Sequence, residues 1–290
     1  MIRSMNIGKK LFILLLALVI LGVGVDIEAK EWKKVRIATE GAYAPWNFVE
    51  TSGKLAGFEI DLFNDICRRM KVECEWIAQD WDGLIPGLKA GKFDIIVDSI
   101  GVTDKRKEVI DFTNYYSFQS SQFATLKSSP LAKSLTENQV VFLDKLTPES
   151  QRQLDELKKV LKGKVIGVQT ATTQSRFIDE HLKGIVDLKE YKTAEQVDMD
   201  LVAGRIDAEM ASVTYLKPLL ATEKGKDFIL VGPNFRGKPF PIGNGAGVRK
   251  NEAELLKMLN DAIDEAIKDG TVKALSLQWF KYDLLEVPKQ

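Results

Sequence analysis

The chain of 290 residues is poor in histidine and cysteine, with one of the first and two of the second. Because His181 stands alone, no catalytic arrangement built on histidine is available, and we expect it to be an exposed helical residue without a special role. Cys67 and Cys74 lie far from His181 and form no CxxC motif, so a metal site is the weaker alternative. In an oxidising compartment these cysteines predict one disulfide that closes a short loop. We expect neither a metal nor another cofactor.

The chain also lacks an excess of charge of either sign, since it has 41 basic and 41 acidic residues. Without the three basic and two acidic residues of the segment 1–29, 38 basic and 39 acidic residues remain, a net charge of −1. This balance gives no support for nucleic acid or an anionic membrane surface as a partner.

Residues 1–29 have the pattern of a signal peptide. Three basic residues come first, residues 11–25 are apolar, and Ala29 is a small residue at the expected cleavage point. The apolar run is shorter than the roughly 20 residues that span a bilayer, which favours export over an uncleaved membrane anchor. No cysteine lies near Ala29 to carry a lipid anchor. We therefore predict a periplasmic protein whose mature chain starts near Lys30.

The mature chain alternates between apolar strand-like runs and amphipathic helical runs. Residues 35–39, 74–78 and 93–97 have the pattern of strands, and residues 57–70 and 81–89 that of helices between them. This α/β alternation predicts a sheet of parallel strands with helices on both faces.

Two motifs recur in the same order along the chain. LKAGKFDII at 88–96 resembles LVAGRIDAE at 201–209, and VRIAT at 35–39 resembles VIGVQ at 165–169. A helix end of the type AGK/R followed by an apolar residue and Asp is a common turn, so one repeat alone would say little. Two repeats in one order favour two α/β lobes, each with a doubly wound, mainly parallel sheet.

The connections between the lobes predict a hinge. Residues 115–125 should be extended and residues 230–244 should run back, so that two strands cross between the lobes. We place the amphipathic helix of residues 252–268 on the first lobe and expect residues 131–160 to form a surface insertion with a helix. The expected ranges are 30–121 with 241–290 for lobe 1, and 122–240 for lobe 2.

A polar loop follows the apolar run 93–97. It contains Asp98, Ser99, Gly101 and Arg106, and so combines a carboxylate, a hydroxyl and a guanidinium. In open α/β sheets, ligands bind outside the carboxyl ends of the strands. The loop therefore predicts a site for a small ligand that carries both charges, such as an amino acid.

Several motifs together resemble the periplasmic solute-binding proteins of family 3, which bind polar amino acids for ABC transporters. These motifs are GFEIDL from Gly57, DWDGLIP from Asp80, TDKR from Thr103, AGRIDA from Ala203 and the closing Trp279-Phe280. The resemblance covers nearly all of the mature chain. It is greatest to the lysine/arginine/ornithine, histidine and octopine/nopaline receptors, and the spacing of Cys67 and Cys74 resembles a disulfide of that branch.

The resemblance implies the two-lobed type II fold of periplasmic binding proteins. A monomer of this kind closes its lobes over an amino acid or opine and delivers it to the membrane permease of an ABC importer. Carried over position by position, the resemblance implies that the ligand-binding residues are Glu40, Tyr43, Trp81, Asp98, Ser99, Gly101, Arg106, Gln169, Thr173 and Ser212.

The resemblance also implies roles for the residues nearest the ligand. Tyr43 and Trp81 would stack on either side of its side chain, with Glu40 at the distal cationic end. Arg106 would pair with its α-carboxylate, to which the Thr173 amide would donate from a helix N-terminus. Ser99 would supply a backbone or hydroxyl contact.

Taken without the resemblance, the same residues have plainer interpretations. Tyr43 and Trp81 would be core aromatics, Arg106 part of a solvated helix start, and Glu40 a cap of a helix or turn.

Three positions depart from the pattern of the general amino-acid receptors. Ser212 replaces an acidic partner of the α-ammonium, Gly101 replaces a serine, and Asp98 replaces a small neutral residue. The change at Ser212, together with room provided by Gly101, would suit the substituted α-nitrogen of an opine. Glu40 and Asp98 still favour a cationic ligand, so a cationic amino acid and an opine both remain open.

Two other functions are compatible with this fold. A cyclohexadienyl-dehydratase-like enzyme would need a general acid, for which Glu40 or Asp98 would serve. We expect no catalysis, because no leaving-group machinery stands out and no further domain follows Trp279. A ligand-sensing module for a membrane receptor would have the same binding site.

Overall fold

The computed structural model describes residues 32–135 and 139–286. The predicted signal peptide lies outside these ranges. Among the described residues, no helix combines the length and the apolar character needed to cross a membrane.

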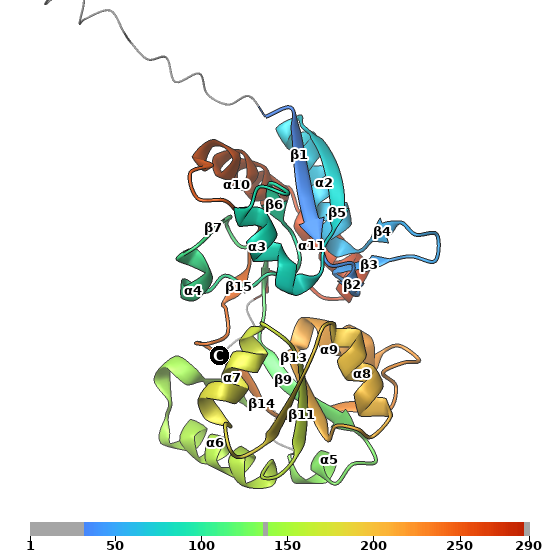
Figure 1. The fold of residues 1–290 in the computed structure, drawn as a ribbon, viewed down its shortest axis with the longest axis vertical. Coiled ribbons are helices and arrows are strands. Elements are labelled where there is room, and N and C mark those ends of the chain that lie inside the picture. The colour runs from blue at the N-terminus through green and yellow to red at the C-terminus, as the bar shows by residue number, and fades with distance from the viewer. Residues whose placement is uncertain (1–31, 136–138, 287–290) are drawn as a thin grey trace, which may run out of the picture. The chain divides into compact units, whose positions relative to one another are not determined.

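The first lobe is built on a five-stranded sheet with the order β5-β1-β6-β16-β7. The central strand β1 (Lys34–Thr39) is parallel to β5 (Glu73–Ala78) on one side and to β6 (Ile95–Ile96) on the other. β16 (Gly247–Val248) and β7 (Asp111–Phe112) complete the sheet with antiparallel pairing. Figure 1 labels β1, β5, β6 and β7 of this sheet. The three strands predicted for this part of the chain are present and parallel.

Helices cover both faces of this sheet, as the alternation predicted. The buried side of α2 (Phe58–Met70) packs with α10 (Ala253–Lys268) and α11 (Thr271–Phe280) in one core cluster, which also contains Ile95. The next residue along β6, Ile96, belongs to the core cluster on the other face, together with α3 (Leu84–Lys89). Successive strand residues point to opposite faces, so an apolar pair is buried on both sides.

The structure confirms two local predictions for this lobe and refines the first of them. The helix expected at 81–89 begins as the 3₁₀ turn η1 (Trp81–Gly83) before α3. Cys67 of α2 and Cys74 of β5 form the predicted disulfide, with their Cα atoms 6.2 Å apart.

The second lobe is built on a six-stranded sheet with the order β10-β14-β9-β13-β11-β12. β11 is parallel to β12 and β13, β10 is parallel to β14, and β9 is antiparallel to β13 and β14. The strands are β9 (Ser121–Leu126), β10 (Val140–Phe142), β11 (Val165–Gln169), β12 (Asp187–Tyr191), β13 (Ala208–Ser212) and β14 (Phe228–Arg236). The helices are α5 (Leu131–Ser134), α6 (Pro148–Val160), α7 (Thr173–His181), α8 (Ala194–Val202) and α9 (Val213–Leu220).

Residues 131–160 are not the surface insertion that we expected. β10 pairs with β14 and thereby forms an edge of the sheet. Val141 of β10 and Leu154 and Leu157 of α6 are buried in the core of the lobe. The many charges of α6 lie on its outer side and hide a short apolar face, which is why the composition of the segment was misleading.

His181 also differs from the expectation, because it is half-buried at the end of α7. Its ring packs on Phe177, with the ring centroids 4.8 Å apart.

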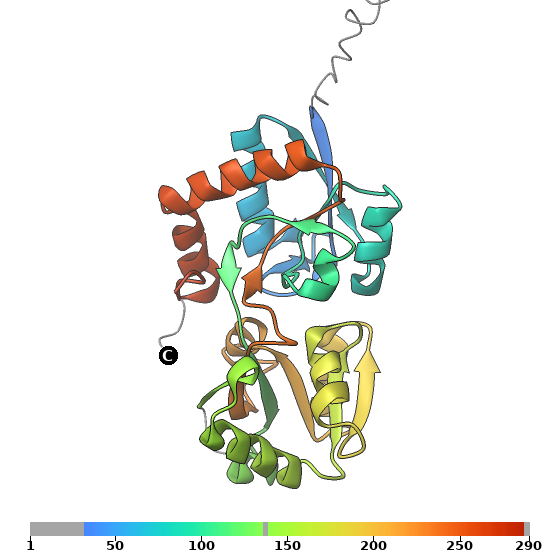
Figure 2. The same cartoon turned by 90° about the vertical axis from the view of Figure 1, so that its left-hand side faces the viewer.

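Two segments join the lobes, as predicted. β8 (Ser117–Phe118) and β15 (Gly243–Asn244) pair antiparallel, and Figure 2 shows them side by side between the two sheets. The C-terminal helices then return to the first lobe, where α10 and α11 contact α2.

A buried carboxyl connects the first lobe to this hinge. Glu59 of α2 is 0% exposed. Its Oε2 accepts a hydrogen bond from Asn47 Nδ2 at 2.9 Å, and its Oε1 accepts from the Ser99 amide at 2.6 Å and from the Tyr116 hydroxyl at 2.5 Å. Burial raises the pKa of Glu59. Asn47 begins β3 (Asn47–Val49), which pairs with β2 (Ala42–Tyr43) and β4 (Leu55–Ala56).

We expect Glu59→Ala to lower the free energy of unfolding by about 2–5 kcal/mol, because each buried donor left without an acceptor costs about 1–3 kcal/mol. Urea unfolding at neutral pH measures this loss. Glu59→Gln keeps the side-chain volume and one acceptor oxygen, and its loss should be smaller. A loss below about 1 kcal/mol for Glu59→Ala would contradict the importance of this group.

Candidate functional site

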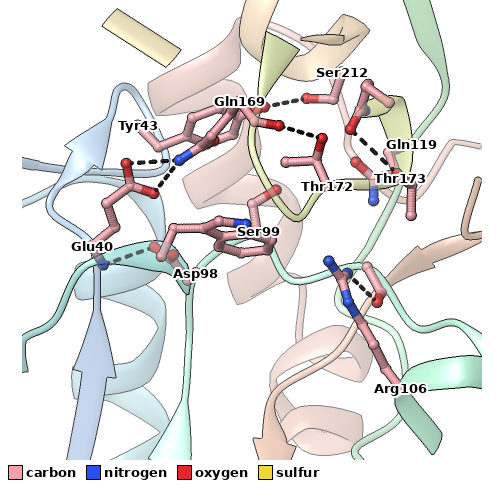
Figure 3. A pocket seen from close by; sticks show the side chains of 13 residues that line it. Glu40, Tyr43, Asp98, Ser99, Arg106, Gln119, Gln169, Thr172, Thr173 and Ser212 are labelled. Atoms are coloured by element: carbon pink, nitrogen blue, oxygen red, sulfur yellow. Dashed lines mark hydrogen bonds between the residues drawn. The ribbon is translucent and has the colours of Figure 1, made fainter. Parts of the chain in front are cut away.

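A cavity of about 40 Å³ lies where the two lobes meet. All ten residues expected at the ligand site line it, and Figure 3 shows most of them. Their part in binding remains a prediction. Three further lining residues were not expected: Gln119, Thr172 and Gln174.

The first lobe contributes two carboxyl groups, Glu40 and Asp98. Glu40 directly follows β1, and Asp98 follows β6 after one residue. Because β1 and β6 are parallel neighbours, their carboxyl ends meet at one edge of the sheet. Asp98 Oδ1 accepts hydrogen bonds from Thr39 Oγ1 and from the Glu40 amide, both at 3.0 Å.

Asp98 is a buried acid, and one of its two carboxyl oxygens lacks a hydrogen-bond donor within the described chain. It is 3% exposed, and its Oδ2 receives no hydrogen bond from any described residue. Burial, and then the neighbouring carboxylates of Glu40 and Glu59, raise the pKa of Asp98 well above its ordinary value. A positive group beside Oδ2 would favour the ionised form.

Glu40 bridges the two lobes. Gln169, at the end of β11 in the second lobe, donates from Nε2 to both carboxyl oxygens of Glu40, at 3.0 and 2.9 Å. Burial raises the pKa of Glu40 to about 7, against the smaller opposing effect of this hydrogen bond. Near neutral pH, Glu40 therefore exists in both protonation states.

Arg106 is held by its own helix turn and by an aromatic ring. It lies in α4 (Asp104–Lys107), where Thr103 Oγ1 caps the helix by accepting from the Arg106 amide at 3.2 Å. The guanidinium donates to the Gly101 carbonyl at 2.8 Å and lies 5.2 Å from the centroid of the Trp81 ring. This cation–π contact orients the guanidinium.

The guanidinium of Arg106 keeps donors for a ligand. Within residues 32–135 and 139–286, no carboxylate forms an ion pair with it, and only its Nη1 donates to the protein. Burial lowers the pKa of Arg106 to about 10, which still leaves the group charged at neutral pH.

The two aromatic residues have stacking partners that the sequence did not predict. The Tyr43 ring stacks on Tyr215 of α9, with centroids 4.5 Å apart and an interplanar angle of 10°. Its hydroxyl lies 2.8 Å from Ser212 Oγ. Trp81 carries Arg106 on its ring. Each ring has a second face, so a ligand between Tyr43 and Trp81 stays a prediction.

The second lobe presents a helix N-terminus to the cavity. Thr173 is the first residue of α7, and Thr172 caps this helix by accepting from the Ser175 amide at 3.2 Å. The first amides of a helix have no partner within it and attract anions. Gln174 donates to Ser121 Oγ at 2.8 Å.

The backbone amide of Ser99 is engaged within the first lobe. Its φ of 44° is left-handed, and its amide donates to Glu59. Its hydroxyl oxygen accepts from Asn244 Nδ2 at 3.0 Å. Of the contacts expected from Ser99, the amide is therefore already used, whereas the carbonyl and the hydroxyl hydrogen are not.

Gly101 does not provide the room that we expected. A Cβ atom at this position would lie 2.3 Å from Pro241 Cγ and 2.8 Å from Gln119 Nε2. The space beside Gly101 is therefore filled by Pro241 and Gln119. Glycine is needed here because the chain that returns through the hinge packs against the loop after β6.

The three unexpected lining residues carried signals in the sequence. Gln119 lies in the segment predicted to cross between the lobes, where polar side chains face the cleft. Thr172 and Gln174 flank Thr173, so the helix N-terminus that drew attention to Thr173 would have included them. Only Thr173 was named because the resemblance assigned a role to that position alone.

Contacts across the cavity compete with a ligand. Glu40 with Gln169, and Tyr43 with Ser212 and Tyr215, connect the two lobes directly. A volume of about 40 Å³ accommodates a few water molecules, which is less than an amino acid occupies. A ligand of that size would replace these contacts as the lobes move apart and close again.

We expect Gly101→Ala to lower the free energy of unfolding by about 1–3 kcal/mol, because the added methyl overlaps Pro241. Urea unfolding measures the loss. Pro241→Ala should relieve it, so that the double variant is more stable than the sum of the single losses predicts. Simple additivity of the two changes would show that Pro241 is not the cause.

Comparisons with known proteins agree with this architecture. The model of the bacterial extracellular solute-binding proteins, family 3, matches residues 35–282. The octopine-binding periplasmic protein of Rhizobium meliloti is 40% identical over 275 residues, which cover 88% of this chain and 93% of that protein. The L-arginine-binding protein of Pseudomonas aeruginosa is 36% identical over 255 residues, 87% of this chain and 90% of that protein.

Solved structures have the same fold. A periplasmic His/Glu/Gln/Arg/opine family-binding protein from Silicibacter pomeroyi, in complex with lysine, aligns with a TM-score of 0.70 at 31% identity. The alignment covers 87% of this chain and 100% of that one. With its two-lobed type II fold and a family match over most of its length, the chain belongs to the bacterial extracellular solute-binding proteins, family 3.

Proposed function

We propose that this protein binds a cationic amino acid, or an opine built on one, in the periplasm and delivers it to the permease of an ABC importer. The observation that carries the proposal is the distribution of charge in the cavity. One unpaired guanidinium, Arg106, shares the cavity with two buried carboxyls, Asp98 and Glu40. A ligand with one carboxylate and additional positive charge complements this set.

The α-carboxylate of the ligand binds at Arg106. The remaining donors of a guanidinium match the two oxygens of a carboxylate in a bidentate pair. Thr173 adds the N-terminus of α7 from the second lobe. Arg106 and Thr173 belong to different lobes, so one carboxylate bridges them and favours closure.

The α-nitrogen binds at Asp98. Its Oδ2 is a buried acceptor without a donor, and a positively charged N–H removes that deficit. Ser212, which stands where the general receptors have an acid, bonds to Tyr43 instead. The first lobe therefore supplies the negative charge that the second lobe lacks at this end of the ligand.

The distal cationic group binds at Glu40, between the available faces of Tyr43 and Trp81. The neutral amide of Gln169 donates to Glu40 in the structure. A charged donor in its place makes the stronger hydrogen bond, roughly twice as strong as a neutral one. The crowding at Gly101 removes one argument for an opine. The proposal therefore rests on the charged groups that arginine-like amino acids and their opines have in common.

Two further parts of the proposal follow from the family. Residues 1–29 direct export and are removed, and the mature chain acts as a monomer. Similarity to the octopine- and arginine-binding relatives supports this role over catalysis.

Calorimetry of the ligand-stripped mature protein tests the function. The ligands are arginine, lysine, ornithine, histidine, octopine and nopaline, and we expect micromolar or tighter binding of at least one. Incubation with prephenate or arogenate checks for aromatic product, which we do not expect. Failure to bind any of the six ligands would refute the proposed function.

A matched pair of variants controls this experiment. Arg106→Ala should cost about 2–5 kcal/mol of binding free energy, because it leaves the ligand carboxylate without its charged partner. Lys105→Ala removes an exposed charge from the same helical turn and should leave the affinity unchanged. Equal affinities for the two variants would contradict the role of Arg106.

The affinity for a cationic ligand should fall as the pH falls through 7. Glu40, with its pKa raised to about 7, is mostly ionised at pH 8 and mostly protonated at pH 6. A cation binds the ionised form, so binding should be roughly tenfold weaker at pH 6 than at pH 8. Calorimetry at both pH values measures this. Glu40→Gln should bind more weakly at pH 8 and flatten the dependence; an unflattened curve would assign the proton to another group.

A further inference from the structure

A second, smaller cavity lies behind Tyr43 and Gln169. It has a volume of about 30 Å³, and we call it the inner chamber. It shares four lining residues with the cavity between the lobes: Tyr43, Gln169, Thr172 and Gln174. The two cavities are therefore neighbours, and these four residues line both of them. The rest of its lining comes from the second lobe: Ala194, Val197, Glu209, Met210 and Ala211.

Glu209 is the only ionisable residue of the second lobe that lines this chamber. It lies on β13 and is 1% exposed. Its carboxyl lies close to that of Asp198 on α8, and each carboxyl affects the pKa of the other. Glu209 Oε1 and Asp198 Oδ1 receive no hydrogen bond from the N–H and O–H groups of the described chain.

Neither carboxyl has a basic partner. No described lysine or arginine forms an ion pair with Glu209 or Asp198; Lys224, whose charge acts on Asp198, pairs with Glu195 at 3.7 Å. The Tyr215 hydroxyl donates to Asp198 Oδ2 at 2.6 Å. Burial raises the pKa of Glu209 well above its ordinary value and that of Asp198 to about 6.

Such a pair is costly for the fold alone. Burying two acids without a cation is unfavourable, and apolar side chains of similar volume would stabilise the lobe more. The residues that flank Glu209 in β13, Ala208 and Met210, are apolar and buried. An acid at this one position, beside a ligand cavity, points to a positive group that comes from outside the chain.

Gln169 marks where such a group would lie. Its Nε2 donates to Glu40 and to the Lys192 carbonyl, and its side chain lines both spaces. A planar group with N–H donors on several edges, in place of this amide, would donate to Glu40 on one edge and present another edge to the chamber that Glu209 lines. A guanidinium has this form, whereas an ammonium is a compact charge on a single nitrogen.

We propose that the inner chamber is the subsite for the terminal guanidinium of the ligand, with Glu209 as an acceptor, and that it makes the protein select arginine-type over ornithine-type ligands. The inference rests on the proposed function and names its ligand class. A chamber of about 30 Å³ accommodates the end of a side chain and not a whole ligand. Ornithine lacks a guanidinium, whereas opines built on arginine carry the same one.

A guanidinium in the chamber would favour the ionised form of Glu209, whose pKa burial raises. A proton bound to this carboxyl would leave as the positive charge enters, so the buried charge stays balanced. Asp198 lines a groove on the outside of the second lobe as well, which gives the proton a route to solvent without separation of the lobes. Binding of arginine should therefore release more protons than binding of ornithine.

Calorimetry with arginine and ornithine tests the subsite. Titrations at pH 7.5 in phosphate and in Tris, which differ in ionisation enthalpy, count the protons released. Glu209→Gln keeps the side-chain size and removes the charge. We expect the arginine affinity to fall about 10- to 100-fold, as for a lost hydrogen bond to a charged group, and the ornithine affinity to change less than about threefold. The additional proton release with arginine should disappear, and octopine should follow arginine.

Glu190→Gln is the matched control. Glu190 lies on β12 of the same sheet, accepts from Ser175 Oγ at 2.7 Å and does not line the chamber. Its substitution should leave the ratio of arginine to ornithine affinity unchanged. If Glu209→Gln fails to fold, Ala211→Val narrows the chamber without a change of charge and should lower the same ratio.

The outcomes separate the two proposals. An unchanged ratio in Glu209→Gln, an equal loss for both ligands, or a wild-type protein that prefers ornithine would overturn the subsite alone. A wild-type protein that binds none of the ligands refutes the proposed function, and the subsite with it.

Discussion

The arrangement of the binding cavity depends on one buried carboxyl, that of Glu59. Through Ser99 it holds the loop after β6 in a left-handed turn, which places Asp98 at the cavity. Through Asn47, whose Oδ1 accepts from the Gly41 amide at 2.9 Å, it fixes the turn that carries Glu40 and Tyr43. Through Tyr116 it reaches the start of the hinge. One acceptor group thereby fixes three segments that are distant in sequence, because buried donors must be satisfied.

The cavity that results contains acidic side chains whose ionised forms are unfavourable there. Asp98 and Glu40 lie close to each other and to Glu59, and burial disfavours the charge on each of them. The second lobe repeats this with Glu209 and Asp198. Fold stability alone does not account for so many buried acids, since each costs desolvation and none of them forms an ion pair with a lysine or arginine of the described chain. Across the cavity, the lobes are joined by hydrogen bonds from uncharged donors and by a ring stack, which a cationic ligand can replace with stronger contacts.

Much of this organisation could be predicted from the sequence, and the exceptions have physical causes. The predictions of strands and helices in the first lobe were correct because the apolar residues of each element recur with a clear sequence period and are buried on one face. Residues 131–160 were wrongly expected to be a surface insertion, because the few apolar residues among their many charges are enough to pack into the core of the second lobe. Gly101 was misjudged because the need for glycine came from Pro241, 140 positions along the chain. The chamber around Glu209 had no local signal, since AGRIDAE resembles an ordinary helix-to-strand turn.

The sequence by itself determined the two α/β lobes, the disulfide and the family, which depend on periodicity, on spacing and on motifs, all local properties of the chain. The ten residues expected at the ligand site came from the resemblance to the family, and all ten line the cavity. Only the tertiary structure decided which groups pair: Arg106 with Trp81, Tyr43 with Tyr215, Glu40 with Gln169 and Glu209 with Asp198. The first and last pairs depend on how the elements of one lobe pack, the other two on which residues meet when the hinge brings the lobes together, and burial then affects the charge of each ionisable group. Neither quantity is a property of any one segment.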